Sequence, residues 1–468
     1  MKKIYFIYAT ILFISNTLLA QPGTNDFTFN PGTGFNAITW SIAIQNDEKL
    51  VVSGDFTEFN GITRNYIARL NPDGTIDASF DPGVGFDNYA RNVAIQGDGK
   101  IIVGGNFTSF DGTSRNRIAR LNADGSLDAS FNPGTGFDLW VRSIAIQNDG
   151  KIIVAGDFTS YNGTTRNRIV RLNIDGTYDA SFNIGSGFDL NLRSIAIQNN
   201  GKLVVGGNFT NYNGTARNRI IRLNQDGTND FSFNPGTGFV NTVNTISIQS
   251  DGKMIVGGAF VSFNGTSRSR IARLNVDGSL DFSFEPGTGF NNNSIVQSTS
   301  LQNDGKILVG GLFISYNDTL SNRIIRLNSD GSRDNSFVTG IGFDYIVYST
   351  FVQSDGKAII LGNFTEYAGT ARNRIIRLMD VSVGIHENMS ENSSFNLYPN
   401  PNNGTFTIKT LTSLNIQIFD SLGQLILKKS ISPGVSNIDL SNHSKGVYYI
   451  STTNKGGYQS TQLMIVTK

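Results

Sequence analysis

The amino-acid sequence predicts an all-β protein: a closed seven-bladed β-propeller followed by a small immunoglobulin-like β-sandwich. Three observations lead to this prediction. The chain has a repeat of 51 residues, turn residues stand at fixed places in every repeat, and the strand that the last repeat lacks stands at the N-terminal end of the chain. The tripeptide Arg-Leu-Asn, which becomes Arg-Leu-Met in the last copy, marks the repeat. It begins at positions 69, 120, 171, 222, 273, 326 and 377. Steps this regular indicate repeated structural units.

The sequence begins with a segment typical of secretory signals. Lys2 and Lys3 precede a short apolar run that ends at Ala20. We therefore expect residues 1–20 to be a cleaved signal peptide, and no later stretch is apolar enough to predict a transmembrane segment. The chain has no cysteine, which excludes disulfides and thiolate ligands. Its formal net charge of +1 gives no reason to expect nucleic acid as a partner.

One unit, residues 142–188, shows why the repeat predicts β-structure. Four runs rich in β-branched and alternating apolar residues stand at 143–147, 151–159, 167–173 and 178–183. Asn-Asp-Gly separates the first two runs and Asp-Gly the last two, and both sequences favour tight hairpin turns. Four antiparallel strands in about fifty residues are the size of one propeller blade, and the recurring glycines exclude a helical repeat.

The number of strand copies predicts how the ring closes. The first three strands occur seven times, but the fourth follows only six of them, because the last repeat stops at Met379. The missing copy stands at residues 24–35, where Asp26 precedes Asp77 by one period of 51 residues. We therefore expect the N-terminal strand to complete the last blade of a propeller that spans residues 21–380. An open solenoid would have no use for a divided repeat.

The units resemble the delta-sixty β-propeller repeats of exported bacterial proteins. The resemblance rests on two patterns, DGK-(I/L)-(I/V)-V-G-G-x-F and R-N-R-I-x-R-L-N-x-D-G, and covers residues 24–379. It implies the fold, but that family has no single activity that could be transferred to this chain.

A different pattern begins after the last repeat. Residues 381–394 are rich in Asn, Ser and Glu, which is typical of a linker. In residues 395–468 we expect a β-sandwich, because alternating strands are predicted at 405–408, 415–419 and 446–451.

This C-terminal domain resembles the type A sorting domain of cargo proteins of the type IX secretion system. The residues that carry the resemblance are Tyr398, Pro399, Asn400, Pro401, Gly404, Phe406, Gly423, Gly446 and Tyr448. The resemblance implies recognition of residues 395–468 by the type IX secretion machinery, followed by release from the cell or attachment to its outer surface. The alternative is an accessory sandwich without a sorting role.

The sequence gives the propeller few catalytic groups. Both histidines, His386 and His443, lie outside the repeats, which excludes a Ser-His-acid triad and an imidazole metal site within them. Most aspartates stand at turn positions, where local hydrogen bonds explain them. Residues 122–128 have too few carboxylates for an EF-hand loop. We therefore expect no cofactor and no metal, with calcium at this recurring turn as the alternative.

The loops opposite the short turns differ from blade to blade, so a binding site is expected among them. They carry five aromatic residues that could line a shallow site: Trp40, Tyr89, Trp140, Tyr345 and Tyr348. Charged residues flank them: Asp87, Asp138, Asp189, Arg91, Arg142 and Arg193. The alternative for each aromatic residue is that it begins the first strand of a blade and packs between blades.

A second set of arginines precedes the third strand of six repeats, at Arg64, Arg115, Arg166, Arg217, Arg268 and Arg372. The sixth repeat has Ser321 there, and it also has Leu312 where most repeats carry Asp or Asn on the second strand. We therefore expect the arginine and this polar residue to form a hydrogen bond within a blade. The fifth repeat, with Ala259 and Arg268, departs from strict pairing.

These observations predict an exported, non-catalytic binding or adhesion protein that is secreted or attached to the outer cell surface. Carbohydrate is the ligand we expect first, because aromatic and hydrogen-bonding side chains suit sugars, and a protein ligand is the alternative. A second hypothesis is a polysaccharide-cleaving enzyme that uses carboxylates among Asp87, Asp138, Asp189 and Asp344. A third hypothesis is a purely structural surface protein.

Overall fold

The structure is a computed structural model, which describes residues 21–291, 293–380, 395–400, 402–410, 412–420, 424–454 and 459–467. The chain divides into two compact units: one spans residues 21–380, and the other contains the C-terminal residues from 381 onward. The predicted signal peptide (1–20) and linker (381–394) lie outside the described residues. In the described part of the chain, no helix is long and apolar enough to cross a membrane.

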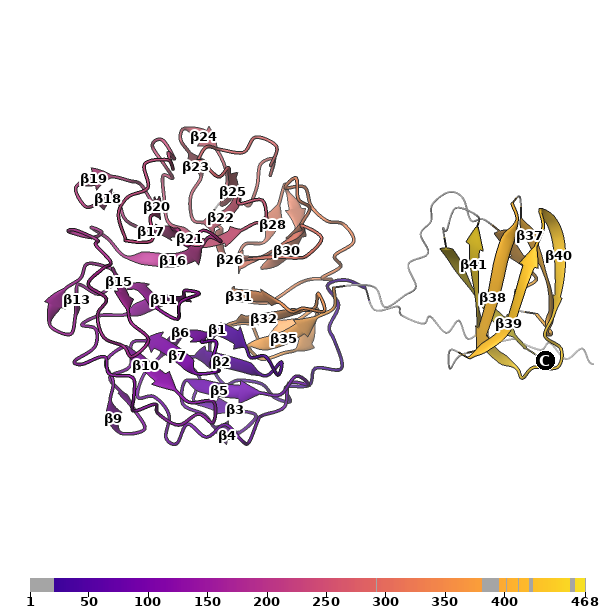
Figure 1. Ribbon diagram of the computed structural model, residues 1–468, viewed down its shortest axis with the longest axis horizontal. Helices are drawn as coiled ribbons and strands as arrows, with labels where there is room; N and C mark the ends of the chain where they lie inside the picture. The colour runs from indigo at the N-terminus through magenta and orange to yellow at the C-terminus, as the bar shows by residue number, and fades with distance from the viewer. Residues whose placement is uncertain are drawn as a thin grey trace, which may run out of the picture. The chain divides into compact units, whose positions relative to one another are not determined.

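Seven blades, numbered 1 to 7 along the chain, form the first unit and surround a common centre (Figure 1). Each blade has an antiparallel three-stranded sheet, and its inner strand contacts the inner strands of both neighbouring blades. The inner strands are β1 (Thr39–Ile44), β6 (Ala90–Ile95), β11 (Val141–Ile146), β16 (Leu192–Ile197), β21 (Val243–Ile248), β26 (Ile295–Leu301) and β31 (Val347–Val352).

The other two strands of each sheet follow outward from the centre. The middle strands are β2 (Leu50–Gly54), β7 (Ile101–Gly105), β12 (Ile152–Gly156), β17 (Leu203–Gly207), β22 (Met254–Gly258), β27 (Ile307–Leu312) and β32 (Ala358–Gly362). The third strands are β5 (Ile67–Leu70), β10 (Ile118–Leu121), β15 (Ile169–Leu172), β20 (Ile220–Leu223), β25 (Ile271–Leu274), β30 (Ile324–Leu327) and β35 (Ile375–Leu378).

Between the middle and third strands, each blade contains a two-stranded hairpin that was not expected from the sequence. In blade 3 its turn is Asn162-Gly163, whose φ angles of 46° and 72° suit a type I′ turn. The hairpins are β3 (Glu58–Phe59) with β4 (Ile62–Thr63), β8 (Ser109–Phe110) with β9 (Thr113–Ser114), β13 (Ser160–Tyr161) with β14 (Thr164–Thr165), β18 (Asn211–Tyr212) with β19 (Thr215–Ala216), β23 (Ser262–Phe263) with β24 (Thr266–Ser267), β28 (Ser315–Tyr316) with β29 (Thr319–Leu320), and β33 (Glu366–Tyr367) with β34 (Thr370–Ala371).

The fourth run of each repeat does not form the full strand expected from the sequence. In blade 3, Tyr178 makes a single bridge to Leu172 of β15, and the chain then turns away. The cause is Asp179, whose carboxylate accepts hydrogen bonds from the backbone N–H (3.0 Å) and the hydroxyl (2.7 Å) of Ser181. This local turn competes with pairing along the sheet edge.

Apolar clusters fill the space between neighbouring blades. In the cluster between blades 2 and 3, the ring of Phe137 packs against those of Phe158 and Tyr161, with centroids 4.4 and 4.6 Å apart. Ile102 and Ile118 of blade 2 are fully buried in the same cluster. Each blade is therefore stabilised by its neighbours, which makes the stability of the array depend on both end blades being covered.

The N-terminal segment lies against blade 7. The backbone N–H of Asp26 donates to the carbonyl oxygen of Arg377 (2.8 Å), and Asn25 pairs with Leu378 of β35. The Asp26 carboxylate is only 3% exposed and forms ion pairs with Arg377 (2.7 Å) and Lys357 (3.0 Å). The segment therefore occupies in blade 7 the place that the fourth run occupies in the other blades.

The same ion-pair network is present in every blade. In blade 3, the buried carboxylate of Asp179 contacts Arg171 (2.6 Å) and Lys151 (2.9 Å). Arg171 also donates to the backbone oxygen of Gln225 in blade 4, at 2.5 Å. We call the seven carboxylates the network aspartates: Asp77, Asp128, Asp179, Asp230, Asp281, Asp334 and, in blade 7, Asp26.

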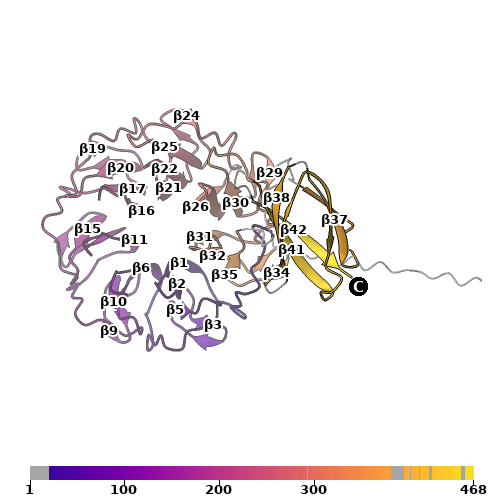
Figure 2. The ribbon, with the colours of Figure 1, turned by 45° about the vertical axis from the view of Figure 1, so that its right-hand side comes forward.

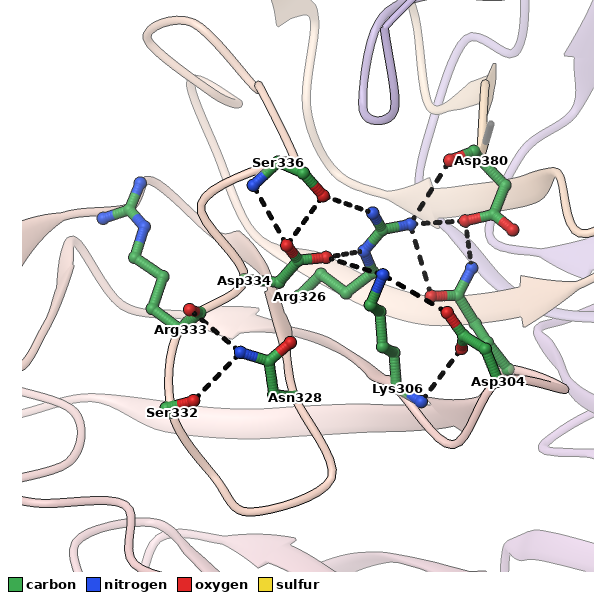
Figure 3. A network of polar contacts seen from close by, with 10 residues as sticks. Asp304, Lys306, Arg326, Asn328, Ser332, Arg333, Asp334, Ser336 and Asp380 are labelled. Carbon is green, nitrogen blue, oxygen red and sulfur yellow. Dashed lines mark hydrogen bonds and ion pairs between the residues drawn. The ribbon is translucent and has the colours of Figure 1, made fainter. Parts of the chain in front are cut away.

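The arginines of this network link each blade to the next. Arg377 of blade 7 donates to the backbone oxygen of Pro72 in blade 1 (2.7 Å), so the links return to their starting point. In blade 7 the partner of Arg326 from blade 6 is Asp380. Its carboxylate pairs with Arg326 and its backbone oxygen accepts a bond from the same guanidinium at 3.5 Å, while Arg326 also binds Asp334 (Figure 3).

The second unit consists of two antiparallel sheets (Figure 2). Strands β36 (Phe395–Tyr398), β37 (Thr405–Thr410) and β40 (Gly434–Asp439) form one sheet. Strands β39 (Leu425–Ile431), β38 (Leu414–Asp420), β41 (Gly446–Asn454) and β42 (Gln459–Val466) form the other. Buried residues from both sheets, such as Phe406 and Ile418, share one core. The three predicted strands lie within β37, β38 and β41.

The residues of the predicted sorting motif lie in and beside these strands. Tyr398 ends β36 and Phe406 is buried in β37. Gly404 has a φ of 102°, in the region that favours glycine, and the buried Tyr448 donates its hydroxyl to the carbonyl oxygen of Ser444 at 2.7 Å. Pro399 and Asn400 follow β36, and Gly446 begins β41. Pro401 and Gly423 lie outside the described residues.

We expect Asp26→Asn to destabilise the propeller as much as a core substitution does. The change leaves Arg377 and Lys357 without their buried partner, and breaking a buried ion pair costs about 3–5 kcal/mol. Urea unfolding of the chain from residue 21 measures this cost. Asp47→Asn is the matched control, because the Asp47 carboxylate is largely exposed and, among the residues that the structure describes, contacts only Lys49. Equal unfolding midpoints for the two variants would contradict the proposed role of Asp26.

The network aspartates predict how stability depends on pH. Burial acts to raise the pKa of Asp77, but hydrogen bonds from Ser79, Lys49 and Arg69 outweigh it and hold the pKa well below its usual range. For Asp334 the pKa is lowered to about 2. A lowered folded-state pKa contributes stability that is complete above the unfolded value, about 3.9, and is lost as the pH falls through the folded value.

Urea midpoints should therefore stay constant from neutral pH down to about pH 5 and fall steeply below about pH 4. The measurement is a series of unfolding curves across this range. If the urea midpoint has already completed its fall at pH 5, groups other than the network aspartates control the stability in acid.

Candidate functional site

Every inner strand has a β-bulge near its start. In blade 3, Val141 pairs with Gly156 and Ser143 pairs with Ala155, so Arg142 has no partner on β12. A bulge of this kind turns the extra side chain out of the regular alternation. The seven extra residues, which we call the bulge ring, are Trp40, Arg91, Arg142, Arg193, Asn244, Gln297 and Tyr348. All seven line the cavity at the centre of the propeller.

A glycine at the end of each middle strand permits the bulge. A Cβ atom on Gly156 would overlap the carbonyl oxygen of Trp140, the residue just before β11. That oxygen instead accepts a hydrogen bond from the backbone N–H of Asp157, at 2.9 Å. A residue without a Cβ atom is therefore needed at this point of the middle strand. The bulge that the glycine permits places the side chains of the bulge ring.

The bulge ring is divided by chemistry into three arcs. Blades 7 and 1 contribute aromatic rings, Tyr348 and Trp40, whose centroids lie 4.1 Å apart. Blades 2, 3 and 4 contribute three consecutive arginines, and the guanidinium of Arg91 stacks on Trp40 at 3.7 Å. Blades 5 and 6 contribute the amides Asn244 and Gln297. The inner strands follow one another around the centre, so residues of like chemistry are neighbours.

These residues surround a pocket of about 380 Å³. Its walls combine six bulge-ring residues with four residues from the adjoining loops and strand ends: Asp55, Tyr89, Asn106 and Trp140. The residue after each bulge continues the wall toward the channel interior, and these seven residues are Ser41, Asn92, Ser143, Ser194, Thr245, Ser298 and Ser349. A layer of small polar side chains therefore lies beneath a ring of larger and more varied ones.

Two carboxylates hold parts of the ring in place. Arg142 forms a bidentate pair with Asp157, with both N–O distances at 2.6 Å. The indole N–H of Trp40 donates to Asp55 at 2.5 Å. Within the described residues, Arg91 and Arg193 form no ion pair with a carboxylate, although both guanidinium groups are partly buried.

The arginines perturb each other. Burial, followed by the charges of Arg142 and Arg193, lowers the pKa of Arg91 to about 10. Burial and the charge of Arg142 also lower the pKa of Arg193. Burial raises the pKa of Asp55. Burial acts in the same direction on Asp157, but its pair with Arg142 outweighs the effect and the pKa is lowered. The pocket therefore concentrates positive charge that its own carboxylates only partly balance.

The structure brings together four of the five predicted aromatic residues. Trp40, Tyr89, Trp140 and Tyr348 line the pocket, and the rings of Tyr89 and Trp140 meet edge to face at 6.0 Å. Tyr345 does not line it, and its side chain is half exposed. The three predicted arginines, Arg91, Arg142 and Arg193, all line the pocket.

The predicted aspartates do not line the pocket. Asp138 accepts hydrogen bonds from the backbone N–H groups of Thr159 (2.9 Å) and Ser160 (3.0 Å) and from the Thr159 hydroxyl (2.5 Å). Asp87 and Asp189 make the same contacts in blades 2 and 4. Burial acts to raise the pKa of Asp138, but these hydrogen bonds lower it. The carboxylates anchor the two-stranded hairpins, which explains their presence without a ligand.

The expected pairing between the second set of arginines and the second strand is wrong. Arg166 donates to the backbone oxygen of the residue before it, Thr165, at 2.6 Å, while Asp157 pairs with Arg142 of the inner strand. Sequence reasoning also missed Asp55, Asn106 and Gln297 as pocket residues, and Asn244 as a residue of the bulge ring. Alignment of the repeats at the bulge position would have revealed the bulge ring, because this position changes from aromatic to arginine to amide while the residue after it stays small and polar.

Few groups in the described residues suit a metal. None of the described residues forms a cluster of three or more His, Asp or Glu side chains that could hold an ion. At the recurring turn considered for calcium, Asp124 accepts hydrogen bonds from the backbone N–H (2.9 Å) and the hydroxyl (2.7 Å) of Ser126, as in a compact turn.

Comparison with known proteins identifies both parts of the chain. The family model described as "Domain of unknown function (DUF5122) beta-propeller" matches seven times, at residues 45–80, 96–131, 147–182, 198–233, 249–284, 302–337 and 353–379. The model described as "Secretion system C-terminal sorting domain" matches residues 396–467. No curated protein sequence matches the chain.

The solved structures that match the chain are distant in sequence. PorZ, an essential surface component of the type IX secretion system of Porphyromonas gingivalis, is 16% identical, with a TM-score of 0.42. The match covers 96% of this chain but only 60% of the PorZ chain. Virginiamycin B lyase from Staphylococcus aureus is 15% identical, with a TM-score of 0.46, and the match covers 73% of this chain and 94% of the lyase. At this distance neither similarity transfers an activity.

The sorting domain indicates export by the type IX route, with secretion or attachment to the cell surface, and implies an interaction with the type IX machinery. The repeat matches together cover more than half of the chain. The chain belongs to the DUF5122 β-propeller family and carries a secretion sorting domain at its C-terminus.

Proposed function

We propose that this chain is an exported, non-catalytic binding or adhesion protein whose central pocket binds an extracellular carbohydrate. The observation that carries the proposal is the composition of the bulge ring, which places aromatic faces, guanidinium groups and amides around one pocket. Aromatic faces cover the apolar faces of sugar rings, and amides and guanidinium groups match sugar hydroxyls. A concave site with a few convergent polar groups is typical of ligand binding.

The scaffold supports this function by fixing the ring in advance. Each ring residue stands on an inner strand that pairs with the middle strand of its blade and contacts the inner strands of both neighbouring blades. The backbone at the bulge is held by the bond between Asp157 and Trp140 or its equivalent in the other blades. Side chains held in place before binding lose little entropy when a ligand arrives.

A second candidate function, cleavage of a polysaccharide, has one observation in its favour. The pKa values of Asp55 and Asp157 are shifted in opposite directions, as those of a general acid and its partner carboxylate are. Against it, both oxygens of Asp157 are bound by Arg142. The carboxylates first considered for this role, Asp87, Asp138, Asp189 and Asp344, accept hydrogen bonds from hairpin backbone N–H groups.

We expect Trp40→Ala to weaken binding to any glycan that the protein recognises by about tenfold or more, because an aromatic wall of the pocket is removed. Titration calorimetry against a panel of neutral and acidic oligosaccharides measures the affinity. Tyr345→Ala is the control. It removes an exposed aromatic ring from the same group of loops, but this ring does not line the pocket. Equal weakening by both variants would place the site elsewhere, and no binding to any oligosaccharide would favour a structural surface role or a protein ligand.

Incubation of bound oligosaccharides with the protein should release no shorter products over a day, as followed by chromatography. Asp55→Asn separates the two candidate functions if products are found, because a general acid is needed for turnover but not for affinity. Product formation that is lost in Asp55→Asn while the affinity is kept would establish the enzyme and overturn the non-catalytic proposal.

A further inference from the structure

The arginines of the bulge ring differ in how their charge is balanced. Fifteen residues after each ring residue, at or just after the end of the middle strand, stands an equivalent position in every blade. In blade 3 it is Asp157, which pairs with Arg142, and in blade 1 it is Asp55, which accepts the indole N–H of Trp40. In blades 2 and 4 this position is Asn106 and Asn208. Blades 2 and 4 therefore carry an uncharged amide at the position from which a carboxylate neutralises Arg142 in blade 3.

The amides do not make up for the missing charge. The side-chain oxygen of Asn208 accepts a hydrogen bond from the hydroxyl of Thr242 in blade 5, so it is directed toward the neighbouring blade. The Nε atom of Arg193 is buried and has no hydrogen-bond acceptor in the described part of the chain. A buried N–H group without an acceptor costs free energy, which an acceptor atom of a ligand can recover.

The excess of positive charge is local. The whole chain carries a formal net charge of only +1. At the pocket, three arginines in consecutive blades face two carboxylates, of which one is bound in the pair with Arg142 and the other accepts the indole N–H of Trp40. The charges of Arg142 and Arg193 act unfavourably on Arg91, which a bound anion would relieve.

We infer that the pocket binds an acidic sugar, with its anionic carboxylate or sulfate group on Arg91 and Arg193 and its ring against Trp40 and Tyr348. This inference rests on the proposed carbohydrate-binding function and adds the class of sugar. The arcs of the ring match the parts of such a ligand: guanidinium groups bind carboxylates or sulfates through paired N–H groups, aromatic rings cover a sugar face, and the amide of Gln297 matches a hydroxyl. A pocket of about 380 Å³ suits one or two sugar residues better than a long chain.

The test compares matched ligands that differ only in charge. Calorimetric titration of the chain from residue 21 uses trigalacturonic acid against its fully methyl-esterified form, and N-acetylgalactosamine 6-sulfate against N-acetylgalactosamine. We expect one acidic member to bind at least about tenfold more tightly than its neutral partner, and the pair that shows this identifies carboxylate or sulfate. The preference should shrink as the salt concentration rises from about 50 to about 300 mM, because charges at a partly exposed pocket are screened.

Two variants connect this preference to the arginines. Arg193→Gln should abolish the preference for the acidic ligand. Arg217→Gln should leave it unchanged, because Arg217 stands in the same blade but is bonded to the backbone of Ala216 and lies outside the pocket. Asn208→Asp recreates the carboxylate that Arg142 already has, and we expect it to weaken acidic ligands about tenfold while sparing neutral ones. This second variant keeps every arginine in place, so its effect does not depend on a lost side chain.

The outcomes separate the inference from the proposed function. Equal affinity for the acidic and neutral members, lost in Trp40→Ala, would overturn the acidic specificity and leave carbohydrate binding intact. A charge preference that survives both Arg193→Gln and Asn208→Asp would overturn the assignment to these arginines. Binding of none of the four ligands, nor of any sugar in a wider panel, would overturn both.

Discussion

A buried carboxylate in each blade is the group on which the rest of the structure depends. Removing a carboxylate from water is unfavourable unless its partners replace the lost hydration, and each network aspartate has an arginine, a lysine and a serine or threonine for this purpose. The same aspartate bends the chain out of the sheet, and its arginine binds the next blade. One residue therefore ends the blade and sets the contact to its neighbour. Because the copy for blade 7 is Asp26, the two ends of the repeat array depend on each other.

The constancy of this network is what allows the centre of the propeller to vary. Inner strands that are held in the same way in every blade begin with the same bulge, and the residues beneath the bulge stay small and polar. The bulge residue itself changes from Trp40 through three arginines to two amides and Tyr348. Variation limited to one ring of positions on a constant scaffold is the pattern expected of a binding site, because the scaffold sets the geometry and the ring sets the chemistry.

Much of the fold could be predicted from the sequence because the same strand and turn pattern occurs in seven repeats. The register of Asp26 with Asp77 placed the N-terminal segment on blade 7, where its backbone and side-chain bonds lie. The two-stranded hairpins were not predicted, because strands of two residues are too short to show a periodic pattern. Asn162-Gly163 and its equivalents do indicate the turn. The fourth strand was overestimated, because a local bond from Asp179 to Ser181 competes with sheet pairing.

The candidate site was predicted in part for a similar reason. Aromatic residues and arginines near the start of the inner strands were identified because they vary between repeats, and seven of these eight residues line the pocket. Asp138 and its equivalents were placed with them because sequence does not show whether a carboxylate faces a ligand or the backbone of a hairpin 21 residues away. The most direct test of acidic-sugar binding is a crystal structure of the chain from residue 21 with trigalacturonic acid. We expect electron density for a sugar on Trp40 with its carboxylate at Arg193, and ligand density elsewhere with an empty central pocket would contradict the proposal.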